Sequence, residues 1–287
     1  MSKLIGFIGQ GWIGKNYADD FEERGFEVVR YSQESGHAPN KDRIARCDIV
    51  FIAVPTPTTP AGFDDSTLIE VLAHVGRGKI AVIKSTVLPQ TTDDLQARYP
   101  DIFVMHSPEF LRAANAAYDA RHPERNIIGI TEQSKHLAHD VLNVLPKAPY
   151  HLITDARTAV LIKYGGNCQF YAKVLFVNTL YDVCQRQGVD YAQVRDAMAA
   201  DPRIGKDFLD VVHEGGRGAG GFCFIKDFAA YRALYEGATG ADKAVEMLKA
   251  MEFYNIELLK NSAKSTDLLT GVYGEELIPQ NPPIASS

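Results

Sequence analysis

The first 24 residues constrain the fold more than any other stretch. Residues 4–8 are a short apolar run that predicts a buried β-strand, and a helix is expected over residues 15–24. Between these segments the chain reads Gly9, Gln10, Gly11, Trp12, Ile13 and Gly14. In a strand–turn–helix setting, the first glycine makes the turn, the second admits a pyrophosphate and the third packs helix on strand. The free N–H groups at the helix start favour phosphate, so we predict a Rossmann-type dinucleotide site.

The second predicted strand, residues 27–31, bears on the choice of cofactor. An acidic residue at the end of this strand usually accepts the adenosine ribose hydroxyls. Ser32 stands there instead, and Arg30, Lys41 and Arg43 are near enough in sequence to accommodate a 2′-phosphate. The residues alone therefore leave NAD and NADP both open.

More apolar segments extend the predicted sheet. Strands are expected at residues 48–54, 79–84, 102–105, 126–130 and 150–154, with a helix over 134–142. Such a doubly wound parallel sheet binds ligands at the carboxyl ends of its strands. Val54, Pro55 and Thr56 follow one strand at that edge, and Thr86 follows the next. We assign the α/β Rossmann domain to residues 1–155.

From residue 155 the pattern changes to that of long helices. Apolar spacing predicts helices over 158–187, 191–199, 207–213, 228–237 and 241–261. We assign residues 156–262 to an α-helical domain. The remainder, residues 263–287 with Pro279, Pro282 and Pro283, is expected to be an irregular tail.

A glycine-rich segment contains the most reactive residue type of the chain. Gly218, Gly220 and Gly221 precede Cys223, and Lys226 and Asp227 follow it closely. A cysteine near positive charge can act as a nucleophile, and a helix starting here would put Cys223 and Asp227 on one face. Local composition alone favours a plainer interpretation: a glycine turn, a buried thiol and a solvated Lys–Asp pair.

Composition narrows the class of protein. The chain has 287 residues and a net charge of −6, which argues against a general nucleic-acid binder. Cys47, Cys168, Cys184 and Cys223 show no Cys-x-x-Cys spacing, as expected of reduced thiols in a cytoplasmic protein. We see no signal peptide and no run of about 18 apolar residues that would span a membrane. No metal-ligand set is predicted, because nothing completes the pair His136 and His139.

Seven motifs together resemble the UDP-glucose/GDP-mannose dehydrogenase family. They occur in the order expected for that family over about residues 1–260. They are the glycine turn at 9–14, Val-Pro-Thr-Pro at 54–57, Lys-Ser-Thr-Val at 84–87, Ser-Pro-Glu-Phe-Leu-Arg at 107–112, Leu-Ile-Lys-Tyr at 161–164 with Asn167, Arg-Ile-Gly at 203–205, and Gly-Gly-Phe-Cys-Phe-Ile-Lys-Asp at 220–227. Family members usually continue into a third domain that binds the nucleotide, so the resemblance implies a shortened form.

The resemblance implies a function and a set of site residues. The family oxidises a primary alcohol to a carboxylate in two steps through a cysteine-linked thiohemiacetal and thioester, using NAD. A nucleotide sugar such as UDP-glucose is the implied substrate, and the helical domain is expected to form a homodimer. The implied catalytic residues are Cys223, Lys163, Asp227, Asn167, Glu109 and Thr86. The implied cofactor residues are Gly9, Gln10, Gly11, Trp12, Ile13, Gly14, Ser32, Val54, Pro55, Thr56 and Thr86. The implied substrate-binding residues are Phe110, Leu111, Arg112, Lys163, Asn167, Arg203 and Gly220, with Arg203 reaching the partner's sugar site.

Departures from the family pattern keep two alternatives open. Ala113 and Val160 stand where glutamates are usual, Phe222 replaces a serine, and Ile225 replaces a proline. One alternative is a two-domain β-hydroxyacid dehydrogenase that would use a lysine and an asparagine on the long helix without Cys223. The other is a cofactor-binding subunit without catalytic activity.

Overall fold

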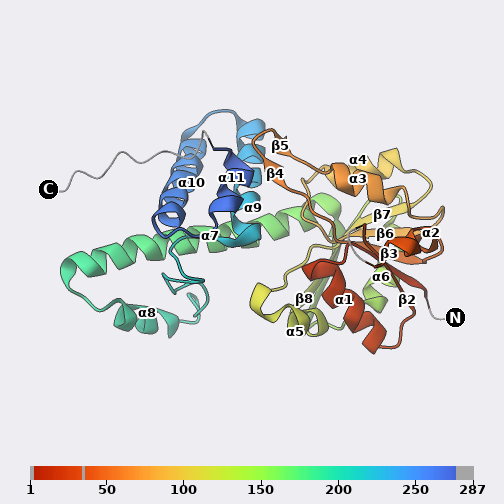
Figure 1. Cartoon of the computed structure of the whole chain (residues 1–287), viewed down its shortest axis with the longest axis horizontal. Coiled ribbons are helices and arrows are strands. Elements are labelled where there is room, and N and C mark those ends of the chain that lie inside the picture. Colours follow the sequence, from red (N-terminus) through yellow and green to blue (C-terminus); the bar gives the residue numbers. More distant parts are fainter. Residues whose placement is uncertain (1–2, 34–35, 276–287) are drawn as a thin grey trace. The chain divides into compact units, whose positions relative to one another are not determined.

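The computed structural model describes residues 3–33 and 36–275 of the chain (Figure 1). The chain forms two compact units. Unit 1 comprises Met1–Thr56 and Asp64–Lys163, and unit 2 comprises Pro57–Phe63 and Tyr164–Ser287. The division therefore falls within the long helix after Lys163, whereas the sequence suggested residue 155. In addition, the short segment 57–63 belongs to unit 2 and not to the unit that precedes it.

Unit 1 is built on a seven-stranded sheet in the order β2-β1-β3-β6-β7-β8-β9. The strands are β1 (Ile5–Ile8), β2 (Val28–Tyr31), β3 (Ile49–Ile52), β6 (Ile80–Ile83), β7 (Phe103–His106), β8 (Arg125–Ile130) and β9 (Tyr150–Asp155). β1, β3 and β6 are buried at every position, as continuous apolar runs in a parallel sheet should be. The predicted α/β fold is confirmed.

The sheet is not parallel throughout. The five strands from β2 to β7 are parallel, but β8 pairs with β7 in the antiparallel sense, with Met105 opposite Ile130. β9 then pairs in parallel with β8. Because β8 starts at the edge where β7 ends, the intervening segment 107–124 stays at that edge. This topology keeps the Ser107–Arg112 motif beside the other strand ends.

Helices cover both faces of this sheet. The face that carries α1 (Trp12–Glu23), α5 (Ala116–Arg121) and α6 (Ala138–Val144) encloses the main core. Phe7, Phe21 and Phe51 meet in this core with ring centroids 5.2–5.3 Å apart. The opposite face carries α3 (Ser66–Leu72) and α4 (Thr91–Arg98), as Figure 1 shows. The short helices of unit 1 are α2 (Lys41–Ile44), η1 (Ala38–Asn40), η2 (Ala113–Asn115) and η3 (Lys135–Leu137).

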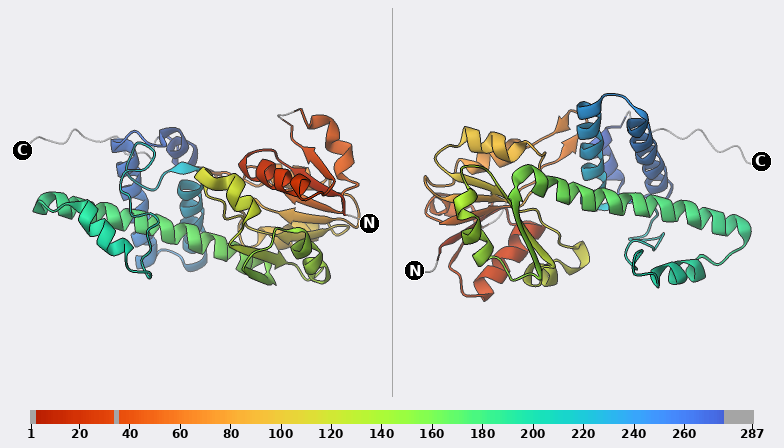
Figure 2. Two further views of the ribbon diagram at one scale, coloured as in Figure 1. Left: turned by 90° about the horizontal axis from the view of Figure 1, so that it is seen from below. Right: turned by 180° about the vertical axis from the view of Figure 1, so that it is seen from behind.

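Unit 2 is helical. Its elements are the greater part of α7 (Ala156–Gln187), α8 (Tyr191–Ala199), α9 (Gly221–Thr239), α10 (Lys243–Asn261), α11 (Thr266–Tyr273) and the hairpin of β4 (Thr58–Thr59) and β5 (Gly62–Phe63). Figure 2 shows α9 and α10 lying against α7. Tyr171 of α7 stacks on Phe228 of α9 with ring centroids 3.9 Å apart. Within the described residues, no helix has both the length and the apolar character needed to cross a membrane.

Three sequence predictions about unit 2 are wrong. Residues 207–213 form no helix, because the chain turns repeatedly there and Phe208 has a φ of 62°. α9 begins at Gly221 and not at residue 228, so Cys223 lies inside a helix. The tail is not irregular from residue 263, since Leu269 of α11 is buried against Ile225. Pro279, Pro282 and Pro283 lie outside the described residues.

Candidate functional site

The glycine turn of unit 1 has the geometry of a phosphate-binding loop. A Cβ atom at Gly9, where φ is +88°, would lie 2.2 Å from the carbonyl oxygen of Ala53. At Gly14 it would lie 1.8 Å from the carbonyl oxygen of Gly9. At Gly11, by contrast, it would meet nothing within 4 Å. Gly9 and Gly14 are thus required by packing, while Gly11 leaves open backbone at the start of α1, where a phosphate is favoured.

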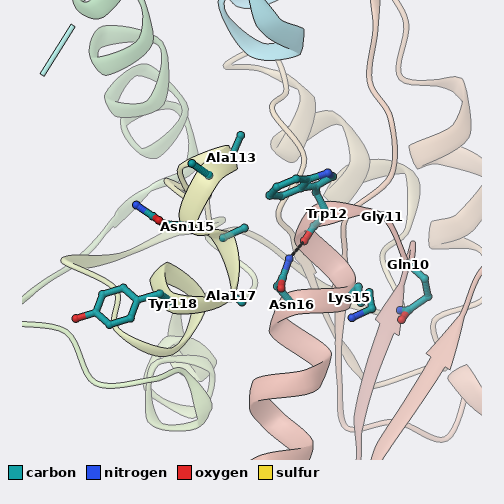
Figure 3. Close-up of a pocket in the computed structure, with 11 residues that line it drawn as sticks. Gln10, Gly11, Trp12, Lys15, Asn16, Ala113, Asn115, Ala117 and Tyr118 are labelled. Carbon is teal, nitrogen blue, oxygen red and sulfur yellow. Dashed lines mark hydrogen bonds between the residues drawn. The ribbon is translucent and has the colours of Figure 1, made fainter. Parts of the chain in front are cut away.

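An open groove of about 660 Å³ lies at the head of α1. One wall comes from the glycine turn and the first turns of α1, and the other is the segment 113–118. In Figure 3 the exposed indole of Trp12 lies at the head of the helix, facing Ala113 across the groove. The Asn16 side chain donates a hydrogen bond to the carbonyl oxygen of Trp12 at 2.7 Å. The groove gives a ligand access to the backbone of Gly11.

The cation on β2 that was expected near the adenosine ribose is already paired with carboxylates. The guanidinium of Arg30 donates to Asp19 at 2.7 Å and to both carboxylate oxygens of Glu22 at 2.8–2.9 Å. This charge is therefore neutralised within the protein. Arg43 donates to the side-chain oxygen of Asn40 at 3.1 Å. Ser32 follows β2 directly and is half-buried, at the position where an acidic ribose acceptor is usual.

The strand ends behind the glycine turn are joined by hydroxyl groups. The Ser85 hydroxyl accepts a hydrogen bond from the backbone N–H of Val54 at 3.0 Å and donates to its carbonyl at 2.7 Å. The buried Thr56 hydroxyl donates to the carbonyl oxygen of Thr86 at 2.6 Å. These bonds fix the loops that follow β3 and β6, and they leave the Thr86 side chain half-buried at the same edge.

Glu109 and Lys163 come together in unit 1. The ammonium of Lys163 donates to the backbone carbonyl of Glu109 at 2.7 Å and lies 3.9 Å from its carboxylate. The other carboxylate oxygen accepts from the backbone N–H of Leu111 at 2.7 Å. Both side chains are buried. Because the segment that carries Glu109 follows β7 directly, α7 and the sheet edge together position this pair.

A second buried lysine beside this pair escaped the sequence analysis. Lys84 donates to the Ser107 hydroxyl at 3.3 Å, and its ammonium lies 4.4 Å from the centre of the Tyr17 ring. Burial and the Lys163 charge lower the pKa of Lys84 to about 8, although Glu109 opposes the shift. The neighbouring His106 is fully buried, and neither ring nitrogen has a hydrogen-bond partner in the part of the chain that the structure describes. Burial, together with Lys84 and Lys163, lowers the pKa of His106 to about 3, so the ring is neutral.

Phe110 and Arg112, expected to bind substrate, make contacts within unit 1. The Phe110 ring lies under the Arg125 guanidinium at 3.9 Å and within 5.6 Å of the Lys163 ammonium. The Arg112 guanidinium donates to both oxygens of Asp119, at 2.6 and 3.0 Å. These hydrogen bonds hold the pKa of Asp119 below its usual value. Arg112 would have to leave Asp119, or share it, to bind a ligand.

In unit 2, the cysteine lies in the first turn of α9 and is exposed. Asp227 follows one turn later, as expected for one helix face, and is almost completely buried. One oxygen of Asp227 accepts from the Lys226 ammonium at 2.5 Å, and the other accepts from the Asn167 side chain at 2.6 Å. Asn167 of α7 and Asp227 of α9 are thus joined directly. Lys226, however, is a buried ion-pair partner and not the solvated lysine of the plainer interpretation.

Gly220 and Arg203, expected to bind substrate, make contacts within unit 2. A Cβ atom at Gly220 would lie 2.6 Å from Cε of Lys264, so the glycine is explained by packing inside unit 2. The guanidinium of Arg203 is exposed and is held by Asp201 through two hydrogen bonds of 2.6 and 3.0 Å. Sequence reasoning missed Lys264 because a lysine near the end of a helix usually stays in solvent.

The candidate site residues fall into a group in unit 1 and a group in unit 2. No group of three or more His, Cys, Asp and Glu side chains in residues 3–33 and 36–275 is arranged to hold a metal ion. Unit 1 instead presents a phosphate-binding turn and the pair Glu109–Lys163. Unit 2 presents a thiol at a helix start with a buried carboxylate one turn away. Lys163 and Asn167 lie one turn apart on α7, so their side chains leave the same side of that helix.

Comparisons with known proteins decide the family. Residues 33–145 match the NAD binding domain of the UDP-glucose/GDP-mannose dehydrogenase family, and residues 157–256 match its central domain. The chain belongs to this family. It therefore carries the family's NAD-binding domain, and its cofactor is NAD.

Relatives and solved structures agree with this assignment. The chain is 33% identical over 248 residues to UDP-glucose 6-dehydrogenase YwqF of Bacillus subtilis, an alignment that covers 82% of this chain and 54% of that protein. It is 27% identical to a UDP-glucose dehydrogenase from Pyrobaculum islandicum, with a TM-score of 0.75 over 91% of this chain and 71% of that one. The chain spans about half the length of the curated relatives it matches.

One similar structure matches this chain over nearly its whole length. The 3-hydroxyisobutyrate dehydrogenase of Mycobacterium tuberculosis has a TM-score of 0.69, and the match covers 94% of this chain and 99% of that one. At 15% identity this likeness concerns the fold alone.

Proposed function

We propose that this chain oxidises the primary alcohol of a nucleotide sugar to a carboxylate, with NAD as the hydride acceptor and Cys223 as the nucleophile. The observation that carries the proposal is the arrangement around Cys223. The thiol lies at the start of a 19-residue helix, and Asp227 lies one turn along the same face, held by Asn167. In the β-hydroxyacid alternative, nothing requires a cysteine at this position.

The first turn of α9 is suited to a thiol that must become negatively charged. Helix N-termini stabilise anions through their free N–H groups and the helix dipole. Cys223 is exposed, so a substrate carbonyl can reach the sulfur. By contrast, burial and Asp227 raise the pKa of the neighbouring Cys168 to about 12, which keeps that thiol protonated and unreactive.

Three of the proposed catalytic residues act in the two oxidations. NAD, when bound, would accept one hydride in each of the two oxidations, so two NAD molecules are needed per substrate. The alcohol loses its hydroxyl proton and a hydride to become an aldehyde, and the Cys223 thiolate adds to the aldehyde carbon to form a thiohemiacetal. Loss of the thiohemiacetal's hydroxyl proton and a second hydride gives a thioester, and water then releases the carboxylate and the thiol. Lys163 supplies positive charge for the alkoxide or oxyanion, and Asn167 adds a hydrogen-bond donor.

Hydrolysis of the thioester needs a group that takes a proton from water. Glu109 is the proposed base, because its carboxylate accepts one backbone N–H and keeps further acceptor capacity. Thr86 and Asp227 are proposed to hold the water. Asp227 is engaged by Lys226 and Asn167, which favours a role in orienting over one in accepting a proton.

We further propose a homodimer formed through α7. Phe176 and Val183 are exposed at 61% and 55%, and a spacing of seven residues places them on one side of the helix. Two exposed apolar residues two turns apart fit the face of a partner helix. In such a dimer, Arg203 would contribute to the sugar site of the partner subunit, once released from Asp201.

The Cys223→Ala variant tests the nucleophile. With a nucleotide sugar and NAD, the wild type is expected to form acid, whereas the variant should form none above background. Cys184→Ala is the matched control, because that buried thiol lies in a separate cluster with Tyr191 and Val211 and should keep full activity. Unchanged acid formation by Cys223→Ala would refute the cysteine-linked route.

A further inference from the structure

The turn between α10 and α11 holds the glycine segment that leads into Cys223. The Ser262 hydroxyl accepts from the backbone N–H of Arg217 at 3.0 Å. The ammonium of Lys264 donates to the carbonyl oxygen of Gly218 at 3.1 Å. The Ser265 hydroxyl accepts from the backbone N–H of Gly221 at 3.2 Å. Three side chains of one turn thus hold the backbone of residues 217–221 by three hydrogen bonds. The central-domain match ends at residue 256, so this turn lies beyond it.

The lysine stem fills space that two glycines leave empty. A Cβ atom at Gly216 would lie 2.7 Å from Cβ of Lys264, and one at Gly220 would lie 2.6 Å from its Cε. The lysine therefore passes between the two glycines with no room for another side chain. Gly220 caps α9, so the position of Lys264 is coupled directly to the start of the helix that carries Cys223.

The turn adopts an unfavourable backbone to make these contacts. Ala263 has a φ of 51° and Ser265 a φ of 55°, although neither is a glycine. A residue with a Cβ atom in this left-handed region costs on the order of 1 kcal/mol. The contacts of Lys264 and Ser265 with the glycine segment are what hold the chain in this conformation.

The charge of Lys264 is the second unusual feature. Its side chain is 7% exposed, and burial lowers its pKa, while Glu214 opposes the shift. Other cations around the segment are paired with carboxylates: Arg217 with Asp182, Lys226 with Asp227, and Arg232 with Glu252. The hydrogen bond that Lys264 donates goes to a neutral carbonyl instead. Burying an ammonium against a neutral carbonyl costs more free energy than burying it against a carboxylate, and such a cost is expected where a site uses the charge.

We propose that Lys264 is a positioning residue for the cysteine step: it fixes the carbonyl of Gly218 and places an ammonium beside the turn that carries the Cys223 thiol. The inference rests on the proposed function for its role in catalysis. Its effect on the thiol itself is independent of any substrate. The positive charge acts together with the N-terminus of α9 to favour the thiolate over the thiol.

The test measures the rate at which iodoacetamide alkylates Cys223 in the full-length protein, followed by peptide mass spectrometry between pH 6 and 10. For Lys264→Met, we expect an at least fivefold lower rate at pH 7 and a rate within twofold of wild type at pH 10, where the thiolate predominates in both. The midpoint of the profile should therefore move to higher pH. Lys264→Arg, which keeps the charge, should return the rate at pH 7 to within threefold of wild type.

Two further variants separate charge from folding. Lys243→Met removes an exposed lysine that contacts Glu246 at the far end of α10, and its profile should match wild type. Lys264→Gln keeps a hydrogen-bond donor for Gly218 but lacks the charge, so it replaces Lys264→Met in the test if that variant does not fold. The midpoint of its alkylation profile should move to higher pH in the same way. A superimposable pH profile in either folded, uncharged variant would overturn the proposal.

Turnover separates this inference from the proposed function. If the wild type oxidises a nucleotide sugar, Lys264→Met should lower kcat at least fivefold with KM for the sugar unchanged within twofold. A raised KM with unchanged kcat would place Lys264 in substrate binding and overturn its positioning role. If the wild type forms no acid but the alkylation profile moves as expected, the proposed function fails and the effect of Lys264 on the thiol stands.

Discussion

Replacing Lys84 with methionine is expected to stabilise unit 1 at neutral pH. The ammonium of Lys84 is buried beside Tyr17 and Ser107, and its pKa falls from 10.5 to about 8. A shift of this size means that the folded state disfavours the protonated lysine by about 3 kcal/mol. The variant loses the hydrogen bond to Ser107 and the contact with the Tyr17 ring, together worth about 1 to 2 kcal/mol. The net gain at pH 7 is therefore about 1 to 2 kcal/mol.

The effect of Lys84 has a definite pH dependence. Below pH 8 the lysine is protonated in the folded and the unfolded state, so the wild type carries the full cost. Between pH 8 and 10.5 the unfolded chain binds this proton more strongly, and the wild type becomes more stable relative to the variant as the pH rises. Near pH 10 the advantage of Lys84→Met should have disappeared, because less than about 1 kcal/mol of the cost is left.

Urea unfolding followed by far-ultraviolet circular dichroism, at pH 7 and at pH 10, measures both quantities. Lys147→Met is the matched control, since Lys147 is an exposed lysine of the same unit. It should change the free energy of unfolding by less than about 0.5 kcal/mol at either pH. A Lys84→Met variant less stable than wild type at pH 7, or a difference between the two proteins that is the same at both pH values, would show that burying the Lys84 charge does not cost stability.

Three further substitutions probe the two units. Gly14→Ala should weaken NAD binding at least tenfold and lower the free energy of unfolding, because the added Cβ would lie 1.8 Å from the carbonyl oxygen of Gly9. Gly11→Ala should weaken NAD binding with little effect on stability, because its added Cβ would meet nothing within 4 Å. Calorimetry and urea unfolding distinguish these outcomes, and equal stability losses in both variants would contradict the assignment. Asp227→Asn should cost about 3 to 5 kcal/mol, because it leaves the buried Lys226 ammonium without its carboxylate. A loss below about 1 kcal/mol in urea unfolding would show that this ion pair contributes little.

The central strands of unit 1 were predictable from the sequence because they are short and wholly apolar. β1, β3 and β6 are buried at every position, so continuous apolar runs between turn residues marked them. The reversal of β8 was not predictable, because strand direction depends on where the connecting segment runs and not on the composition of the strand. Nothing in residues 126–130 distinguishes a parallel from an antiparallel neighbour.

The candidate site was only partly predictable, for a similar reason. Sequence spacing indicated that Cys223 and Asp227 share a helix face, and that Lys163 and Asn167 do. It gave no sign that Lys226 is buried against Asp227, or that Lys84 lies under Tyr17. It also missed the contact of Lys264 with Gly218, which joins residues 46 positions apart. Packing between residues far apart in the sequence decides whether a lysine is buried or solvated, and the pattern of residues around the lysine in a single sequence does not predict that packing.

The proposed two-step oxidation can be measured by counting the NADH formed per molecule of UDP-glucose that the purified protein consumes, with UDP-glucuronate as the expected product. A cysteine-linked route should yield two NADH per sugar in the wild type and no acid product in Cys223→Ala. One NADH per molecule of a simple β-hydroxy acid, with Cys223→Ala unaffected, would contradict it and favour the β-hydroxyacid reaction. Tight NAD binding without oxidation of any alcohol in a panel of nucleotide sugars and hydroxy acids would contradict it as well, and would favour a cofactor-binding subunit.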